Sequence, residues 1–159
     1  MLTQIGKLTN VFFYNCTYTA FGKENFMTEK LQLYKCDVCN NLVEVLQNGE
    51  GELVCCGQPM KLIQPQDNEN SQYSDKHVPV FEKTVEGYKI RVGVHPHPMT
   101  EEHHIDFIQA ISKDNKYVKT KFLSLEDEPE LNVKCKCNAS IWARALCNIH
   151  GLFKNEYEE

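Results

Sequence analysis

The sequence predicts an all-β protein in two parts, a small cysteine-rich unit followed by a β-sandwich. Two observations lead to this expectation. Short segments of alternating apolar and polar residues recur between turn signals. The residue types that bind metals also occupy different parts of the chain: four of the eight cysteines lie between positions 36 and 56, and all six histidines lie beyond position 74. A length of 159 residues suits one ordinary domain or two small ones.

Composition and charge exclude several classes of protein. Hydrophobic residues make up 42% of the chain and charged residues 25%, which is typical of globular proteins rather than disordered ones. No apolar run approaches the ~18 residues of a membrane span, so we expect no membrane partner. The net charge of −5 argues against a broad nucleic-acid surface, and we expect no nucleic-acid partner.

Residues 1–27 form an extension, which includes Cys16 and to which we assign no function. Its apolar segment is too short and too polar for a signal-peptide core, and no small-residue cleavage site follows. We therefore expect a cytoplasmic protein, because thiols stay reduced in the cytoplasm and cysteine clusters there usually bind metal.

Residues 28–63 are expected to form the small unit. Leu31, Leu33 and the pair Val43/Val45 alternate as short strands do, and Asn-Gly-Glu-Gly at 48–51 is a turn signal. A segment of about 36 residues cannot bury enough apolar surface to fold alone, so a metal or disulfides must help. The polar residues 64–74 are expected to be a linker.

Residues 75–159 are expected to fold as the sandwich, with hairpin turns at 85–87 and 113–116. The predicted strands are 78–84, 88–94, 103–112, 117–123, 131–138 and 141–147. About seven short strands with regular turns are typical of an immunoglobulin-like sandwich. Alternation in 131–138 places Cys135 and Cys137 on the apolar face, where we expect them to pack as small hydrophobic residues.

The first candidate metal site contains four cysteines: Cys36, Cys39, Cys55 and Cys56. A C-x2-C turn directs two thiolates at one ion, and the adjacent pair, fifteen intervening residues later, would complete a tetrahedron of soft ligands. Such a site selects zinc or iron, and ligand type alone does not separate redox iron from structural zinc. Two disulfides are the alternative that a secreted domain would favour.

The second candidate site combines histidines with one thiolate. Its residues lie in four segments: 75–77, 95–99, 101–104 and 147–150. Imidazole suits iron, zinc, copper and nickel, and four imidazoles with one thiolate would leave an octahedral ion one open position. In the loop 95–104 we favour His97 and His103 as ligands, and we expect His95 and His104 at the surface or behind the ligands.

Together these motifs resemble those of desulfoferrodoxin, the family of two-iron superoxide reductases. The resemblance runs from about residue 28 to the end and keeps the order of every motif. The matching motifs are Cys36-x2-Cys39-x15-Cys55-Cys56, Asp75-Lys76-His77-Val78-Pro79-Val80, His97-Pro98-Met99, Glu101-Glu102-His103 and Cys147-Asn148-Ile149-His150. The resemblance implies a desulforedoxin-like first domain and an immunoglobulin-like second domain.

The resemblance also implies two irons per chain. One would be held by the four cysteines, and the other by four equatorial imidazoles and an axial thiolate. The implied equatorial ligands are His77, His97, His103 and His150, and the implied axial ligand is Cys147. The family reduces superoxide by one electron to hydrogen peroxide. Rubredoxin-type proteins are its usual electron donors, and homodimers are common.

Two residues beside His77 bear on this reaction. Lys76 would lie near the rim of the site, where a cation attracts a small anion, although on a strand or extended loop it would point away from the metal. The family usually has Glu where this chain has Asp75, and that carboxylate can occupy the sixth position of resting ferric iron. Asp75 is one methylene shorter, so two candidates stand for the sixth position of the ferric resting state: the carboxylate of Asp75, and water or hydroxide.

Two alternative functions belong to other classes. In the first, both irons would carry electrons without acting on a substrate, and in the second the protein would be a zinc-binding structural module. An open ferric site would bind cyanide or azide, whereas the closed site of a carrier would not. A metal without redox activity would favour the structural module.

Overall fold

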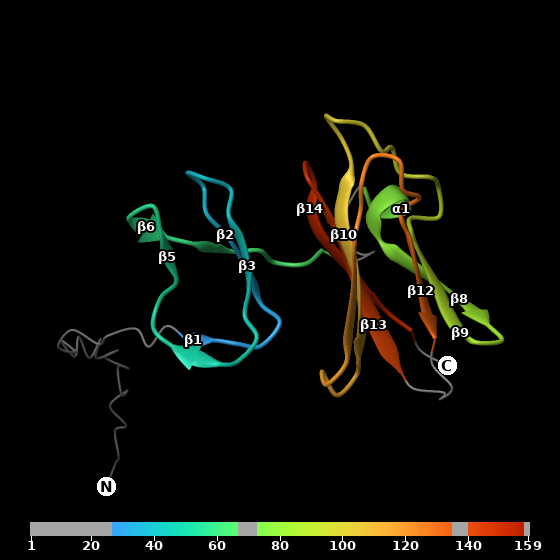
Figure 1. Cartoon of the computed structure of the whole chain (residues 1–159), viewed down its shortest axis with the longest axis horizontal. Coiled ribbons are helices and arrows are strands. Elements are labelled where there is room, and N and C mark those ends of the chain that lie inside the picture. The colour runs from blue at the N-terminus through green and yellow to red at the C-terminus, as the bar shows by residue number, and fades with distance from the viewer. Residues whose placement is uncertain (1–26, 67–72, 135–139, 158–159) are drawn as a thin grey trace, which may run out of the picture.

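The computed structural model of the chain describes residues 27–66, 73–134 and 140–157. Cys16, Cys135 and Cys137 lie outside the described residues, and so does the end of the strand predicted at 131–138. Two β units lie side by side, the first formed by residues before 67 and the second by residues after 72 (Figure 1). In the described ranges, no helix has the length and apolar character needed to cross a membrane.

The first unit consists of short antiparallel strands in three small sheets, ordered β1-β4, β3-β2-β7 and β5-β6. Its strands are β1 (Met27–Thr28), β2 (Leu33–Lys35), β3 (Leu42–Glu44), β4 (Gly49–Glu50), β5 (Val54–Cys55), β6 (Gln58–Pro59) and β7 (Lys61–Leu62). Strands of two or three residues bury little apolar surface, which agrees with the expected need for a metal.

The second unit is a sandwich of two antiparallel sheets, ordered β11-β10-β13-β14 and β12-β9-β8. A single helical turn, α1 (Ser74–His77), precedes it. Its strands are β8 (Pro79–Thr84), β9 (Gly87–Val92), β10 (Ile105–Ser112), β11 (Val118–Phe122), β12 (Glu130–Lys134), β13 (Ile141–Cys147) and β14 (Gly151–Glu156). The all-β fold and both predicted hairpins are confirmed, whereas α1 and β14 are elements that the sequence patterns did not single out.

Strand β13 explains how the sandwich and the first unit fit together. Its core face carries Ala143, Ala145 and Cys147, which pack in the main hydrophobic cluster of the sandwich. Its other face carries Leu146, which packs with Leu33 of the first unit. Both faces of β13 are therefore buried, and Cys147 stands at the last core-facing position of the strand.

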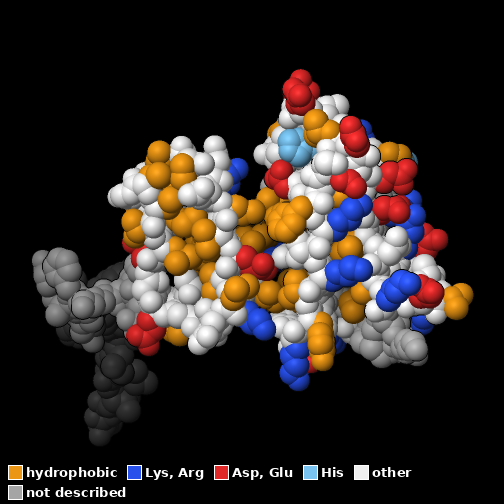
Figure 2. All heavy atoms as spheres, viewed as in Figure 1, with side chains coloured by type: hydrophobic (Ala, Val, Ile, Leu, Met, Phe, Trp, Pro, Cys, Tyr) orange, Lys and Arg blue, Asp and Glu red, His pale blue; other side chains and the backbone are white. Residues whose placement is uncertain are grey.

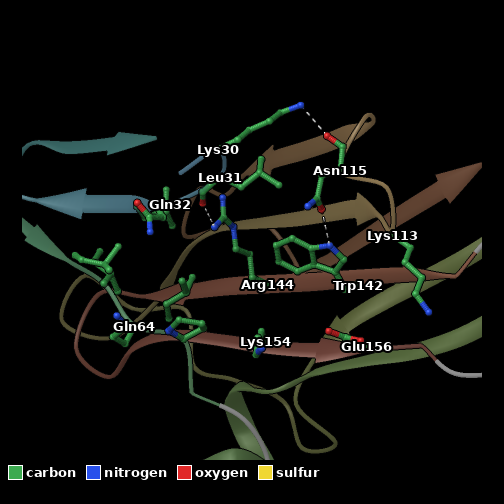
Figure 3. Close-up of a pocket in the computed structure, with 15 residues that line it drawn as sticks. Lys30, Leu31, Gln32, Gln64, Lys113, Asn115, Trp142, Arg144, Lys154 and Glu156 are labelled. Carbon is green, nitrogen blue, oxygen red and sulfur yellow. Dashed lines mark hydrogen bonds between the residues drawn. The ribbon is translucent and has the colours of Figure 1, made fainter. Parts of the chain in front are cut away.

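The buried guanidinium of Arg144 joins the two units on the outer face of β13. It donates hydrogen bonds to the carbonyl oxygen of Leu31 at 2.5 Å, to Oε1 of Gln109 at 2.6 Å and to Oε1 of Glu44 at 2.7 Å. Figure 3 shows the bond from Arg144 to Leu31 beside the hydrogen bonds that Lys30 and Trp142 make with Asn115. These bonds join residues far apart in sequence, so the small unit is docked onto the sandwich.

Candidate metal centres

The four cysteine sulfurs of the first unit converge on one point. All four lie within 4.8 Å of one another, and the Sγ of Cys55 is 3.6 Å from that of Cys39 and 3.9 Å from that of Cys56. Metal–sulfur bonds of about 2.3 Å in a tetrahedron would place the sulfurs about 3.8 Å apart. The spacing therefore fits one tetrahedral ion.

Two tight turns create this convergence. In the first, the amide of Asn40 donates to the carbonyl of Cys36 at 3.0 Å, and Asn40 has a left-handed φ of 60°. In the second, the adjacent residues Cys56 and Gly57 connect β5 to β6 with φ values of 51° and 76°. Positive φ at both central residues is typical of a type I′ hairpin turn. This turn brings the sulfurs of two consecutive cysteines to the same side.

The thiols of this cluster differ in acidity because they lie so close together. Backbone amides of Cys39 and Val38 lower the pKa of the Cys36 thiol to about 7. Neighbouring thiols, that of Cys39 first, raise the pKa of Cys55 and raise that of Cys56 to about 12. Four sulfurs at these distances cannot all carry negative charge unless a bound cation offsets their repulsion.

Four imidazoles form a square at one end of the sandwich. Taken in the order His77, His97, His103, His150, neighbouring ring centroids are 4.6, 4.5, 4.8 and 4.6 Å apart, and the 77–103 diagonal measures 5.8 Å. Neighbouring rings stand at 69–84° to one another. Four rings arranged in this way direct four nitrogens toward a common centre.

The nitrogens that face the centre can be identified from the remaining hydrogen bonds. Nδ1 of His77 lies 2.8 Å from the carbonyl oxygen of Tyr73, and Nδ1 of His97 lies 2.6 Å from that of Pro98. Each Nδ1–H donates to its carbonyl, which leaves Nε2 as the acceptor nitrogen. Nε2 of His77 lies 3.0 Å from Nε2 of His97 and 3.0 Å from Nδ1 of His150.

Cys147 places its sulfur beside this square. Its Sγ is 3.5 Å from Nδ1 of His150, and His77, His103, Cys147 and His150 offer ligand atoms within 4.8 Å of one another. His97 falls outside that mutual limit and joins the group through its contact with His77. The donor set is therefore one thiol sulfur and four imidazole nitrogens.

The chemistry of these donors suits binding to a metal ion better than hydrogen bonding to one another. Nε2 of His103 is buried and has no hydrogen-bond partner in the part of the chain that the structure describes. Burial lowers the pKa of His77 and of His103, and lowers that of His97 to about 4, which favours the neutral form of these imidazoles. Burial also raises the pKa of Cys147, so its thiolate would need a nearby cation. Neutral nitrogens whose lone pairs face one another suit a soft or borderline cation such as iron.

The remaining predicted residues lie outside this donor set. Asp75 and Lys76 are exposed on α1, and Asp75 contributes no carboxylate to a metal-sized group within the described ranges. His95 is exposed, and His104 is 2.9 Å from the carbonyl oxygen of Thr100 through Nδ1. Sequence reasoning assigned no role to Tyr73, whose ring lies 4.2 Å from that of His150, because no motif marks it.

Comparisons with known proteins match both units. One family model, described as the N-terminal domain of desulfoferrodoxin, matches residues 28–63, and a second, described as desulfoferrodoxin, matches residues 69–156. The desulfoferrodoxin of Desulfarculus baarsii is 48% identical over 130 residues, which cover 82% of this chain and 99% of that protein. A superoxide reductase of Pyrococcus abyssi is 36% identical over 100 residues, which cover 53% of this chain and 87% of that protein.

A solved structure has the same fold. The superoxide reductase from Treponema pallidum matches with a TM-score of 0.60, over 79% of this chain and 97% of that chain. Sequence identity in this match is 20%, so the likeness concerns the fold.

Proposed function

The chain belongs to the desulfoferrodoxin family, and we propose that it is a superoxide reductase with two irons. The reaction takes one superoxide, one electron and two protons to one hydrogen peroxide. The observation that carries the proposal is the square of four imidazoles with the sulfur of Cys147 beside it. We assign the second iron to Cys36, Cys39, Cys55 and Cys56.

The described residues prepare the substrate site in two ways. The four imidazoles and Cys147 offer five donors, one fewer than an octahedral ion takes, so one position is left for superoxide. Iron bound there would supply the electron. Cys147 would hold this iron through its thiolate, which would donate electron density to the metal, as cysteine does at haem iron. We assign the sixth position to the substrate and leave Asp75 outside the ligand set.

We assign Lys76 to attraction of the anion. It precedes His77 on α1, and its side chain is exposed rather than buried in the donor set. A cation at the mouth of a site raises the arrival rate of an anion by about 10- to 1,000-fold. The overall charge of −5 makes a local cation more important.

The first unit provides the surface for electron entry from a rubredoxin-type donor. Cys39 and Cys56 are exposed, and Figure 2 shows hydrophobic side chains over much of the visible face of this unit. Its exposed large hydrophobic residues are Met27, Val38, Leu42, Val43, Leu46 and Val54. An apolar surface around a redox centre suits transient docking of a small protein, and such a surface also favours the homodimer that we propose.

We place the protein in the cytoplasm. Five cysteines in the described ranges are free, and both proposed centres need reduced sulfur. Reducing surroundings keep thiols in that state.

The decisive experiment measures metal content and spectrum together. We expect two irons per chain and a thiolate-to-iron absorption band in the oxidised protein. Reductant should bleach this band, and superoxide should restore it. One iron per chain, zinc in either centre, or a reduced protein that superoxide leaves unchanged would contradict the proposal.

The role of Lys76 has a matched control. Lys76→Ile should slow superoxide reduction about 10-fold at low salt and flatten the salt dependence of the rate. Lys134→Ile removes the same charge at the far end of the sandwich, where Lys134 pairs with Glu86, and should change neither. Equal rates in the two variants would remove Lys76 from the mechanism.

A further inference from the structure

His103 differs from the other imidazoles in how its ring is held. His77 and His97 each direct Nδ1 at a backbone carbonyl, and the ring of His150 packs on Tyr73. Among the described residues, neither ring nitrogen of His103 has a hydrogen-bond partner, although its Nε2 is buried. Ligand histidines are normally oriented by a bond from the second ring nitrogen. Something else must orient His103.

The side chain of Asn148 holds the backbone on both sides of His103. Its Nδ2 donates to the carbonyl oxygen of Glu102 at 2.9 Å, and its Oδ1 accepts from the amide of His104 at 3.0 Å. The backbone amide of Asn148 also donates to the carbonyl oxygen of His104 at 3.1 Å. Three hydrogen bonds therefore connect one residue to the two neighbours of His103.

The bonds of Asn148 fix the position of the loop that carries His103 relative to the turn that carries Cys147 and His150, which contacts within that loop cannot do. Thr100 also bonds the backbone of His103, at 3.1 Å through Oγ1 and at 3.0 Å through its amide, but it belongs to the same loop. Asn148 lies 44 residues from His104 and directly follows Cys147. It therefore ties the loop that carries His103 to the turn that carries Cys147 and His150.

We propose that Asn148 is a positioning residue for the second iron. It sets where the nitrogen of His103 lies relative to the other four donors, and so replaces the orienting hydrogen bond that the ring lacks. This inference rests on the proposed iron site but not on the reaction, because it concerns iron retention.

The test compares three variants of the full-length, iron-loaded protein. Asn148→Ala removes both side-chain bonds, whereas Asn148→Asp keeps the acceptor for the His104 amide and loses the donor to Glu102. Asn155→Ala is the control, because the side chain of Asn155 donates a similar 2.9 Å bond to the carbonyl oxygen of Pro79, the first residue of β8. The measurements are the rate at which a chelator removes the second iron and the position of its absorption band.

We expect Asn148→Ala to lose the second iron about 10- to 100-fold faster than the parent protein, with a shifted band. Asn148→Asp should be intermediate, and Asn155→Ala should match the parent. The four-cysteine iron should keep its spectrum in all variants, which reports that the chain is folded. If Asn148→Ala does not fold, Asn148→Asp carries the test.

The inference would be overturned if the variants of Asn148 lost the second iron at the rate of the parent protein and kept its absorption band unshifted. It would also be overturned if Asn155→Ala lost the second iron as fast as Asn148→Ala. A parent protein that binds two irons but does not reduce superoxide would refute the proposed function and leave this test intact.

Discussion

The hydrogen bonds of Arg144 that join the two units should contribute strongly to the free energy of unfolding. The variant Arg144→Met tests this expectation. Methionine keeps an apolar stem but removes the guanidinium, whose side chain is 5% exposed. The carbonyl oxygen of Leu31 would then lose its donor in a buried site, which costs about 1–3 kcal/mol. Breaking a buried ion pair from one side costs about 3–5 kcal/mol.

The cost of about 3–5 kcal/mol for breaking an ion pair is too high for the pair of Arg144 and Glu44, because Glu44 is only partly buried. Its side chain is 26% exposed and keeps the hydrogen bonds from Nε2 of Gln109, so water and Gln109 partly replace the guanidinium. We therefore expect a net loss of about 3 kcal/mol in the free energy of unfolding. For a protein of this size, that lowers Tm by about 6–12 °C.

The assay is urea unfolding of the iron-loaded protein, followed by circular dichroism and by the fluorescence of Trp142, the single tryptophan of the chain. Glu44→Gln and the double variant complete a mutant cycle. We expect the two changes to be coupled by more than 1 kcal/mol, because the two side chains share a 2.7 Å bond. A loss below about 0.5 kcal/mol for Arg144→Met, or strict additivity in the cycle, would refute this view of the junction.

Three further predictions concern the centres themselves. Cys147→Ser should abolish the thiolate-to-iron band of the second centre and leave the four-cysteine spectrum unchanged, since the two ligand sets share no residue; a retained band would exclude Cys147 as a ligand. Cys39→Ser should disturb only the first centre, so superoxide oxidation of the chemically reduced second iron, followed by stopped-flow absorbance, should keep its rate. Gly93→Ala should destabilise α1 and release the second iron, because a Cβ at residue 93 would lie 2.6 Å from the backbone of Lys76 at a φ of +76°. Gly51→Ala, with a φ of +98° and open space around its Cβ, should cost only the backbone strain of about 1–2 kcal/mol and keep both irons; equal iron loss in the two variants would contradict the steric explanation.

Much of the protein could be predicted from local patterns. The C-x2-C turn, the adjacent cysteines and the segment from Cys147 to His150 are contiguous, so each motif largely determines the geometry of its own turn. The strand predicted at 141–147 coincides with β13, because a run of strand-forming residues marks it even where both faces are buried.

Tertiary structure alone decided the features that depend on contacts between distant segments. Alternation distinguishes an inner from an outer face only when the outer face meets water, and the first unit covers that face of β13, which is why Arg144 is buried there. The contact of His77 with His150 and the bonds of Asn148 to the neighbours of His103 join residues separated by dozens of positions. Local residue patterns determined which atoms can bind metal, and long-range packing determined where those atoms meet, because the loops that carry them are positioned by the sandwich rather than by their own sequence.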